Sequence, residues 1–234
     1  MPLSNELLES RWNGLSLLHG DGIEIGAFDQ PSRLPAGASV RYVDVFTRKE
    51  GMQTFPEVDS SSIVDPDVIS NLDKQGLGVI PDASADFVIA CHVLEHLANP
   101  IGAIAEMFRV LKRDGCLVVA VPDKRFTFDK PREITSFEHL WLDYLNKAQS
   151  SDDDHYSDFL SAIMPLHQMP KSEWPEHIQR ARRRNEHAHV WDSNAFADLL
   201  LLAIPLSGHR AKRLYESSGD VNRFEYFCVW RKSA

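Results

Sequence analysis

Two segments of the chain concentrate side chains that can transfer protons or bind charged groups. Residues 123–125 read Asp-Lys-Arg directly after an apolar run, and residues 186–192 read Glu-His-Ala-His-Val-Trp-Asp. An imidazole or carboxylate that accepts the proton of a reacting hydroxyl group can raise a rate about 10²–10⁴-fold. Arg125, His139 and His189 are therefore candidates for catalytic contacts with a substrate.

The histidine spacing also raises the question of a metal site. His187 and His189 would share one face of an extended segment, because successive side chains of a strand alternate. Histidine is the commonest ligand of transition metals, and Asp192 and His139 could complete a ligand set. No HExxH or CxxC pattern accompanies these residues, so we expect no functional metal.

The elements that would position these groups are clearest at residues 84–122, which read strand, loop, helix, turn and strand. Residues 87–90 and 116–121 are apolar runs of buried-strand length. The helix between them is predicted to begin at its N-cap Asn99 and to end at Gly115. This pattern predicts a parallel α/β domain.

The same unit resembles the second half of a class I S-adenosylmethionine-dependent methyltransferase. The resembling residues are 86–89 (Asp-Phe-Val-Ile), the loop at 91–97 (Cys-His-Val-Leu-Glu-His-Leu) and 109–115 (Arg-Val-Leu-Lys-Arg-Asp-Gly). The usual turn in that family is Leu-Lys-Pro-Gly-Gly, so Arg113 and Asp114 depart from it. The resemblance implies an α/β fold with a doubly wound, mostly parallel seven-stranded sheet, the Rossmann-like methyltransferase fold, and S-adenosyl-L-methionine as cofactor.

The first half of the domain should then hold the nucleoside. Residues 22–31 fit a strand that runs into a tight turn, and a second strand ends in Asp44, whose carboxylate would accept hydrogen bonds from the ribose hydroxyls. Gly26 is the one glycine of a loop that commonly has three, since Phe28 and Gln30 stand at the other two places. These substitutions argue against a pyrophosphate cradle, but S-adenosylmethionine carries no phosphate.

The resemblance implies further contacts with the cofactor. Asp73 matches the family's acid ahead of Leu and Ile-Pro-Asp and would face the adenine, although an exposed loop aspartate is an equal alternative. His92 directly follows the fourth strand, where it would either line the methionine end of the cofactor or act on the acceptor. The full expected cofactor set is Glu24, Gly26, Ala27, Asp44, Val45, Asp73, Cys91 and His92.

Composition restricts the classes of partner. The 234 residues include 25 Lys plus Arg against 34 Asp plus Glu, with the basic residues scattered, so we expect no nucleic-acid partner. Three cysteines do not make a disulfide framework. The first 20 residues are amphipathic and carry Glu6, Glu9 and Arg11, so we expect neither a signal peptide nor a membrane partner, and a cytoplasmic location.

The organisation along the chain is uneven. Residues 123–192 are too long for a simple connection and contain helical patches, so we interpret them as a helical cap that carries acceptor specificity through Arg125, His139 and His189. We expect a single methyltransferase domain over residues 1–234, made of an N-terminal helix at 1–19, a cofactor-binding half at 20–122, the cap at 123–192, and a terminal helix and strand pair at 193–234.

The resemblance, which extends to bacterial methyltransferases of carbohydrate-linked acceptors, implies a methyltransferase acting on a small-molecule or glycan-type hydroxyl. The arginine-rich run at residues 179–184 would either contact an anionic acceptor or form a solvated helix face. Two alternatives stay open. One is a non-catalytic nucleoside-binding module, and the other is an NAD-dependent oxidoreductase, which would need the missing GxGxxG loop. The oligomeric state is not predicted.

Overall fold

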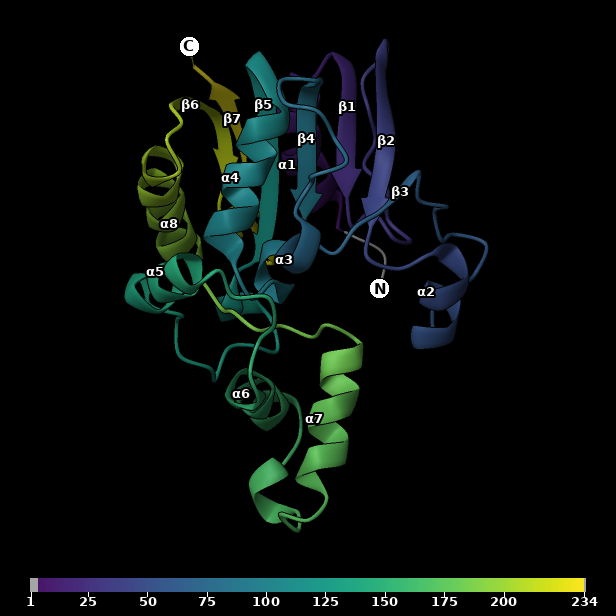
Figure 1. Cartoon of the computed structure of the whole chain (residues 1–234), viewed down its shortest axis with the longest axis vertical. Coiled ribbons are helices and arrows are strands. Elements are labelled where there is room, and N and C mark those ends of the chain that lie inside the picture. The colour runs from purple at the N-terminus through teal and green to yellow at the C-terminus, as the bar shows by residue number, and fades with distance from the viewer. Residues whose placement is uncertain (1–3, 234) are drawn as a thin grey trace.

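The computed structural model describes residues 4–233 and contains one seven-stranded sheet (Figure 1). Its strands are β1 (Gly20–Ile25), β2 (Ala38–Asp44), β3 (Val68–Ile69), β4 (Ala85–Cys91), β5 (Leu111–Pro122), β6 (Ala211–Ser217) and β7 (Glu225–Lys232). They lie in the order β3-β2-β1-β4-β5-β7-β6. The first five are parallel, and β7 runs antiparallel between β5 and β6. The expected mostly parallel seven-stranded sheet is confirmed.

Helices cover both faces of the sheet (Figure 1). The α-helices are α1 (Asn5–Leu15), α2 (Arg48–Thr54), α3 (Leu72–Gln75), α4 (Pro100–Val110), α5 (Phe137–Asn146), α6 (Asp153–Ile163), α7 (Trp174–Arg183), α8 (Ser193–Leu206) and α9 (Gly219–Asn222). Short 3₁₀ helices are η1 (Leu94–His96), η2 (Lys124–Phe126) and η3 (Leu166–Gln168). α4 and α8 pack on one face and α1 on the other. Among residues 4–233, no helix is long and apolar enough to cross a membrane.

The central strands are apolar on both faces because both faces are covered. In β4, Val88 and Ala90 belong to the core under α4 and α8, whereas Phe87 and Ile89 belong to the core under α1. Such two-sided burial produces the continuous apolar run seen in the sequence, in place of an alternating one.

The boundary between α4 and β5 differs from the prediction. The helix ends at Val110, and β5 begins at Leu111, well before the expected turn at Gly115. Pairing with β4 shifts between Leu111 and Cys116, so the residues between them form an irregularity within the ladder. A Cβ atom at Gly115 would lie 3.0 Å from the Asp86 carbonyl oxygen. The glycine therefore permits a close approach of two strands and does not end the helix.

The cap, residues 123–192, lies beyond the carboxyl ends of the parallel strands and contains α5, α6 and α7 (Figure 1). Its two ends lie together, because Asp123 and Trp191 form a parallel bridge and the Lys124 N–H donates to the Trp191 carbonyl at 2.9 Å. The apolar faces of α6 and α7 pack against each other in a small core of their own.

Candidate functional site

Two cavities open at the carboxyl edge of the sheet. The smaller has a volume of about 190 Å³ and lies over the ends of β1, β2 and β4. The larger, of about 870 Å³, lies between α1, the loop after β1 and the segment before β7. Gly26, Phe28 and His92 line both cavities. This is the edge at which ligands bind in open α/β sheets.

All eight residues expected to contact the cofactor line these cavities. The smaller cavity is lined by Gly26, Asp44, Val45, Asp73 and His92. The larger one adds Glu24, Ala27 and Cys91. The structure thus brings the expected set together from four separate segments, although lining a cavity does not by itself assign a ligand.

Asp44 ends β2 with its carboxylate beside the smaller cavity. Its Oδ1 accepts a hydrogen bond from the Phe46 N–H at 3.1 Å. A carboxylate offers about four acceptor positions, so capacity remains for two hydroxyl donors. Burial raises the pKa of Asp44 above its ordinary value, and hydroxyl donors that replace water would favour the charged form.

The conformation of the loop after β1 explains how it makes its tight turn with one glycine in place of three. Gly26 has φ +67°, and a Cβ atom built there would lie 2.9 Å from Cγ2 of Val93. Phe28 itself adopts φ +44°, and its ring packs edge-on against Phe55 at a centroid distance of 5.1 Å. The aromatic residue therefore takes a left-handed conformation that glycine usually supplies, and its ring becomes a wall of both cavities.

Two acids of the expected set hold backbone segments. Both Glu24 oxygens accept the Ser32 N–H, at 3.0 and 3.1 Å, and so fix the loop after β1. Asp73 accepts the N–H groups of Ala98 and Asn99 at 3.0 and 3.1 Å, just ahead of α4. Burial raises the pKa of both acids. The Asp73 carboxylate therefore anchors the start of α4.

His92 lies in a chain of buried charges. Its Nε2 is 2.7 Å from Oε2 of Glu225, and its Nδ1 is 3.3 Å from Oε1 of Glu95. Arg11 donates two hydrogen bonds to the Glu225 carboxylate, at 2.8 and 2.7 Å. Burial disfavours the imidazolium, but the hydrogen bonds with Glu225 and Glu95 outweigh it and raise the pKa of His92 to about 9. At neutral pH, His92 is therefore a cation and a hydrogen-bond donor.

A third cavity, of about 220 Å³, begins at His92 and extends toward the cap. His92, Pro122, Phe126, Thr127, Phe128, His187 and Phe224 line it. His187 Nδ1 lies 2.7 Å from Oδ2 of buried Asp129, whose other oxygen accepts from Arg132 at 2.8 Å. Because Nδ1 donates to this carboxylate, Nε2 of His187 is left as the acceptor nitrogen.

The other residues expected to be catalytic lie outside these three cavities. Arg125 forms ion pairs with Asp123 at 2.7 Å and with Asp220 at 3.1 Å. His139 and His189 lie close to each other and to a histidine that the sequence analysis did not include. Conversely, Arg11, Glu225 and the pair of Asp129 with His187 were not predicted. The polar run that contains His187 was recognised, but its pairing with Asp129 was not.

The arginine-rich run divides between two roles. Arg182 pairs with Asp153 within the cap, as a helix-face arginine would. Arg184 instead lines the smaller cavity, donates to the Thr54 carbonyl at 3.1 Å and lies over the Phe55 ring, with a distance of 4.4 Å to the centroid. The return segment, defined as residues 184–192, thus joins the cap to the cavity edge.

Residues 57–119 match the family model described as a methyltransferase domain. A "Probable S-adenosylmethionine-dependent methyltransferase" from Mycolicibacterium smegmatis is 36% identical over 73 residues. That alignment covers 31% of this chain and 28% of the relative's own length. The resemblance expected from the sequence is therefore confirmed over this segment, which runs from β3 into β5.

Two solved structures are similar to this chain at low identity, and the one with the higher TM-score shares its fold. A Rhodobacter sphaeroides protein, assigned provisionally as a Zn-dependent alcohol dehydrogenase, is 15% identical with a TM-score of 0.55, over 100% of this chain and 92% of that one. A SAM-dependent methyltransferase from Aquifex aeolicus is 14% identical with a TM-score of 0.48, over 99% and 91% of the two chains. Together, the strand order and the matched segment define a Rossmann-like methyltransferase fold.

Proposed function

We propose that this protein is an S-adenosylmethionine-dependent methyltransferase whose acceptor is a hydroxyl group of a small molecule or glycan. The observation that carries the proposal is the arrangement of the cavities around His92. The smaller one offers Asp44 and Gly26, and the one that extends to the cap offers His187. A donor and an acceptor bound on the two sides of His92 would meet there.

The residues of the first two cavities, of about 870 and 190 Å³, fit the cofactor. Asp44 retains acceptor capacity for a ribose, and Gly26 lines the same cavity without a side chain. When bound, S-adenosylmethionine supplies an electrophilic methyl group and departs as a neutral thioether. The enzyme's main task in such a displacement is to hold donor and acceptor in line.

The pair of His187 with Asp129 is suited to accept the proton of a hydroxyl acceptor. Asp129 holds the ring through Nδ1, which leaves Nε2 of this cavity-lining histidine to serve as the base. Nε2 would take the hydroxyl proton while the oxygen bonds to the methyl carbon and the carbon–sulfur bond breaks. His92 is less suited to this role, because its pKa of about 9 keeps it protonated at neutral pH.

The walls of the third cavity favour a ring-shaped acceptor. Phe126, Phe128 and Phe224 present aromatic surfaces, and Thr127 and His187 supply polar groups. This combination of apolar walls and a few polar groups is typical of small-molecule sites. It is consistent with a sugar ring placed over aromatic side chains with one hydroxyl near His187.

The test is methyl transfer by the full chain. The protein is incubated with methyl-labelled S-adenosylmethionine and a panel of monosaccharides, uronic acids, sugar nucleotides and oligosaccharides, and labelled products are separated. Label in an alkali-stable methyl ether of one panel member supports the proposal. Methyl transfer only to amines or thiols would support methyltransferase activity but would contradict a hydroxyl acceptor.

A further inference from the structure

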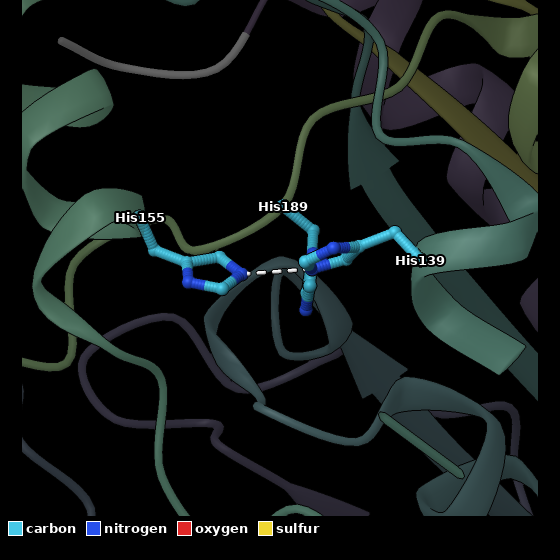
Figure 2. A group of neighbouring side chains, drawn as sticks. All are labelled: His139, His155 and His189. Atoms are coloured by element: carbon cyan, nitrogen blue, oxygen red, sulfur yellow. Dashed lines mark hydrogen bonds between the residues drawn. The ribbon is translucent and has the colours of Figure 1, made fainter. Parts of the chain in front are cut away.

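Three histidines from distant parts of the cap converge on one point (Figure 2). His139 comes from α5, His155 from α6 and His189 from the return segment. One ring nitrogen of each lies within 4.8 Å of the others, and Nε2 of His139 is 2.9 Å from Nε2 of His155. Around one zinc ion with bonds of about 2.0–2.1 Å, tetrahedral ligand nitrogens lie about 3.4 Å apart. The observed spacing is close to that arrangement.

One buried residue at this point is otherwise unexplained. His189 is 1% exposed, and within residues 4–233 neither of its ring nitrogens has a hydrogen-bond partner. A buried polar atom without a partner has lost its hydration and regained no hydrogen bond. The unpaired ring of His189 therefore points to a missing ligand. Asp143, on α5, pairs with His139, with 3.2 Å between Oδ2 and Nε2.

The surroundings also orient the rings as metal ligands. His155 Nδ1 lies 2.7 Å from Oδ1 of Asp152, which fixes the tautomer and leaves Nε2 with its lone pair toward the cluster. A carboxylate that accepts from the outer nitrogen of a histidine is the usual partner of a metal-bound imidazole.

We propose that His139, His155 and His189 bind one divalent transition-metal ion, for which zinc is the best fit. Three imidazole ligands with one further position left to solvent suit zinc. The ion would join α5 and α6 to the return segment. Because that segment also supplies His187 and Arg184 to the cavities, the metal would fix the position of the cap over the site.

The expectation of no metal rested on the missing HExxH and CxxC patterns, and the ligand set then considered did not include His155. A second group, formed by Glu95, His96 and His187, has similar spacing. There, however, Glu95 already faces protonated His92, with Oε1 3.3 Å from Nδ1. A cation at that point would be repelled by the imidazolium of His92. We therefore expect one ion per chain, at the three histidines of Figure 2.

The experiment measures zinc in the purified full chain by mass spectrometry and zinc binding to the chelator-treated chain by calorimetry. We expect one tight site per chain. His155→Ala and His189→Ala should abolish it, and Asp152→Asn should weaken it about 10–100-fold through the outer hydrogen bond. His167→Ala is the matched control, because this histidine of the cap is exposed and outside the cluster.

Cobalt substitution supplies a second readout that a purely structural role of the histidines would not give. The wild type loaded with Co²⁺ should show the intense visible absorption of a tetrahedral ion, and His139→Ala should lack it. Because the His139 side chain is only partly buried, this variant tests the site even if His189→Ala does not fold. The inference is overturned if the folded wild type binds zinc no more tightly than the double variant His139→Ala/His155→Ala.

Discussion

Glu225, the first residue of β7, holds the ring of His92 at the end of β4, with 2.7 Å between Oε2 and Nε2. The two residues are 133 positions apart in the sequence. Arg11 on α1 and Glu95 in η1 complete the buried chain of alternating charges. The antiparallel strand and the N-terminal helix thereby fix the residue that lines all three cavities.

Stability should therefore depend on pH through His92. Its pKa rises from 6.5 to about 9 on folding, so its contribution is complete below pH 6.5 and is lost as the pH rises through 9. The shift corresponds to at most about 3 kcal/mol. We expect the free energy of unfolding, measured with urea, to fall over this range in the wild type and to change less in His92→Asn. His19→Asn, at an exposed histidine, is the control. If the free energy of unfolding varies with pH in the same way in the wild type and in His92→Asn, the ion pair of His92 with Glu225 does not cause the pH dependence.

Glu225 should act in the opposite pH range. Burial alone would raise its pKa, but hydrogen bonds with Arg11 and His92 outweigh burial and lower the pKa from 4.5 to about 2. Its contribution is complete above pH 4.5 and is lost as the pH falls toward 2. Glu225→Gln should lower stability at pH 6 and flatten the acid limb of the unfolding curve. An unchanged acid limb in the folded variant would contradict this role.

Asp44→Ala should weaken S-adenosylmethionine binding by about tenfold or more, since a hydrogen bond to a charged group contributes about 1.5–3 kcal/mol. The matched control is Asp65→Ala, an exposed aspartate in the segment that leads to β3. Calorimetry on both variants is the measurement. A folded Asp44→Ala protein with wild-type affinity would exclude this carboxylate from the cofactor site.

Gly26→Val should abolish cofactor binding because a Cβ there would lie 2.9 Å from Cγ2 of Val93 and would force the cavity wall that both residues line to shift. Backbone strain alone is controlled by Gly37→Val. Gly37 has φ +83° and no atom within 4 Å of a Cβ built there, so that variant carries the strain without the obstruction. Equal loss of affinity in the two folded variants would show that strain, and not the cavity wall, is responsible.

His187→Gln and Asp129→Asn should lower turnover about 10²–10⁴-fold and 10-fold or more, respectively, with cofactor affinity unchanged. His187 is the proposed base, and Asp129 holds its tautomer at 2.7 Å. Thermal unfolding measured beside turnover separates a base from a structural residue. Loss of turnover at an unchanged melting temperature supports the base, whereas a loss that only follows a lowered melting temperature would contradict it.

Local patterns predicted the elements that form the sheet centre and the cofactor edge. Residues adjacent in the sequence define the apolar runs of β4 and β5 and the N-cap of α4 at Asn99. The positions of Gly26 and Asp44 followed from strands that end at the same edge of a parallel sheet. α7 was not placed, since much of its sequence is charged and its apolar residues contact α6 only in the folded cap.

The remaining site residues depend on contacts between distant segments. Arg11 meets Glu225 across 214 positions, and His187 meets Asp129 across 58. Nothing in the sequence near either residue indicates its partner. His155 shows the same limit, because its neighbours His139 and His189 come from other elements.

The central claim is that the cavities around Gly26, Asp44 and His92 bind S-adenosylmethionine. The most direct measurement is calorimetry of the full chain with S-adenosylmethionine, its demethylated product and NAD in parallel. The account predicts saturable binding of the first two at one site per chain and none of NAD. Binding of NAD without S-adenosylmethionine, or of neither, would contradict it.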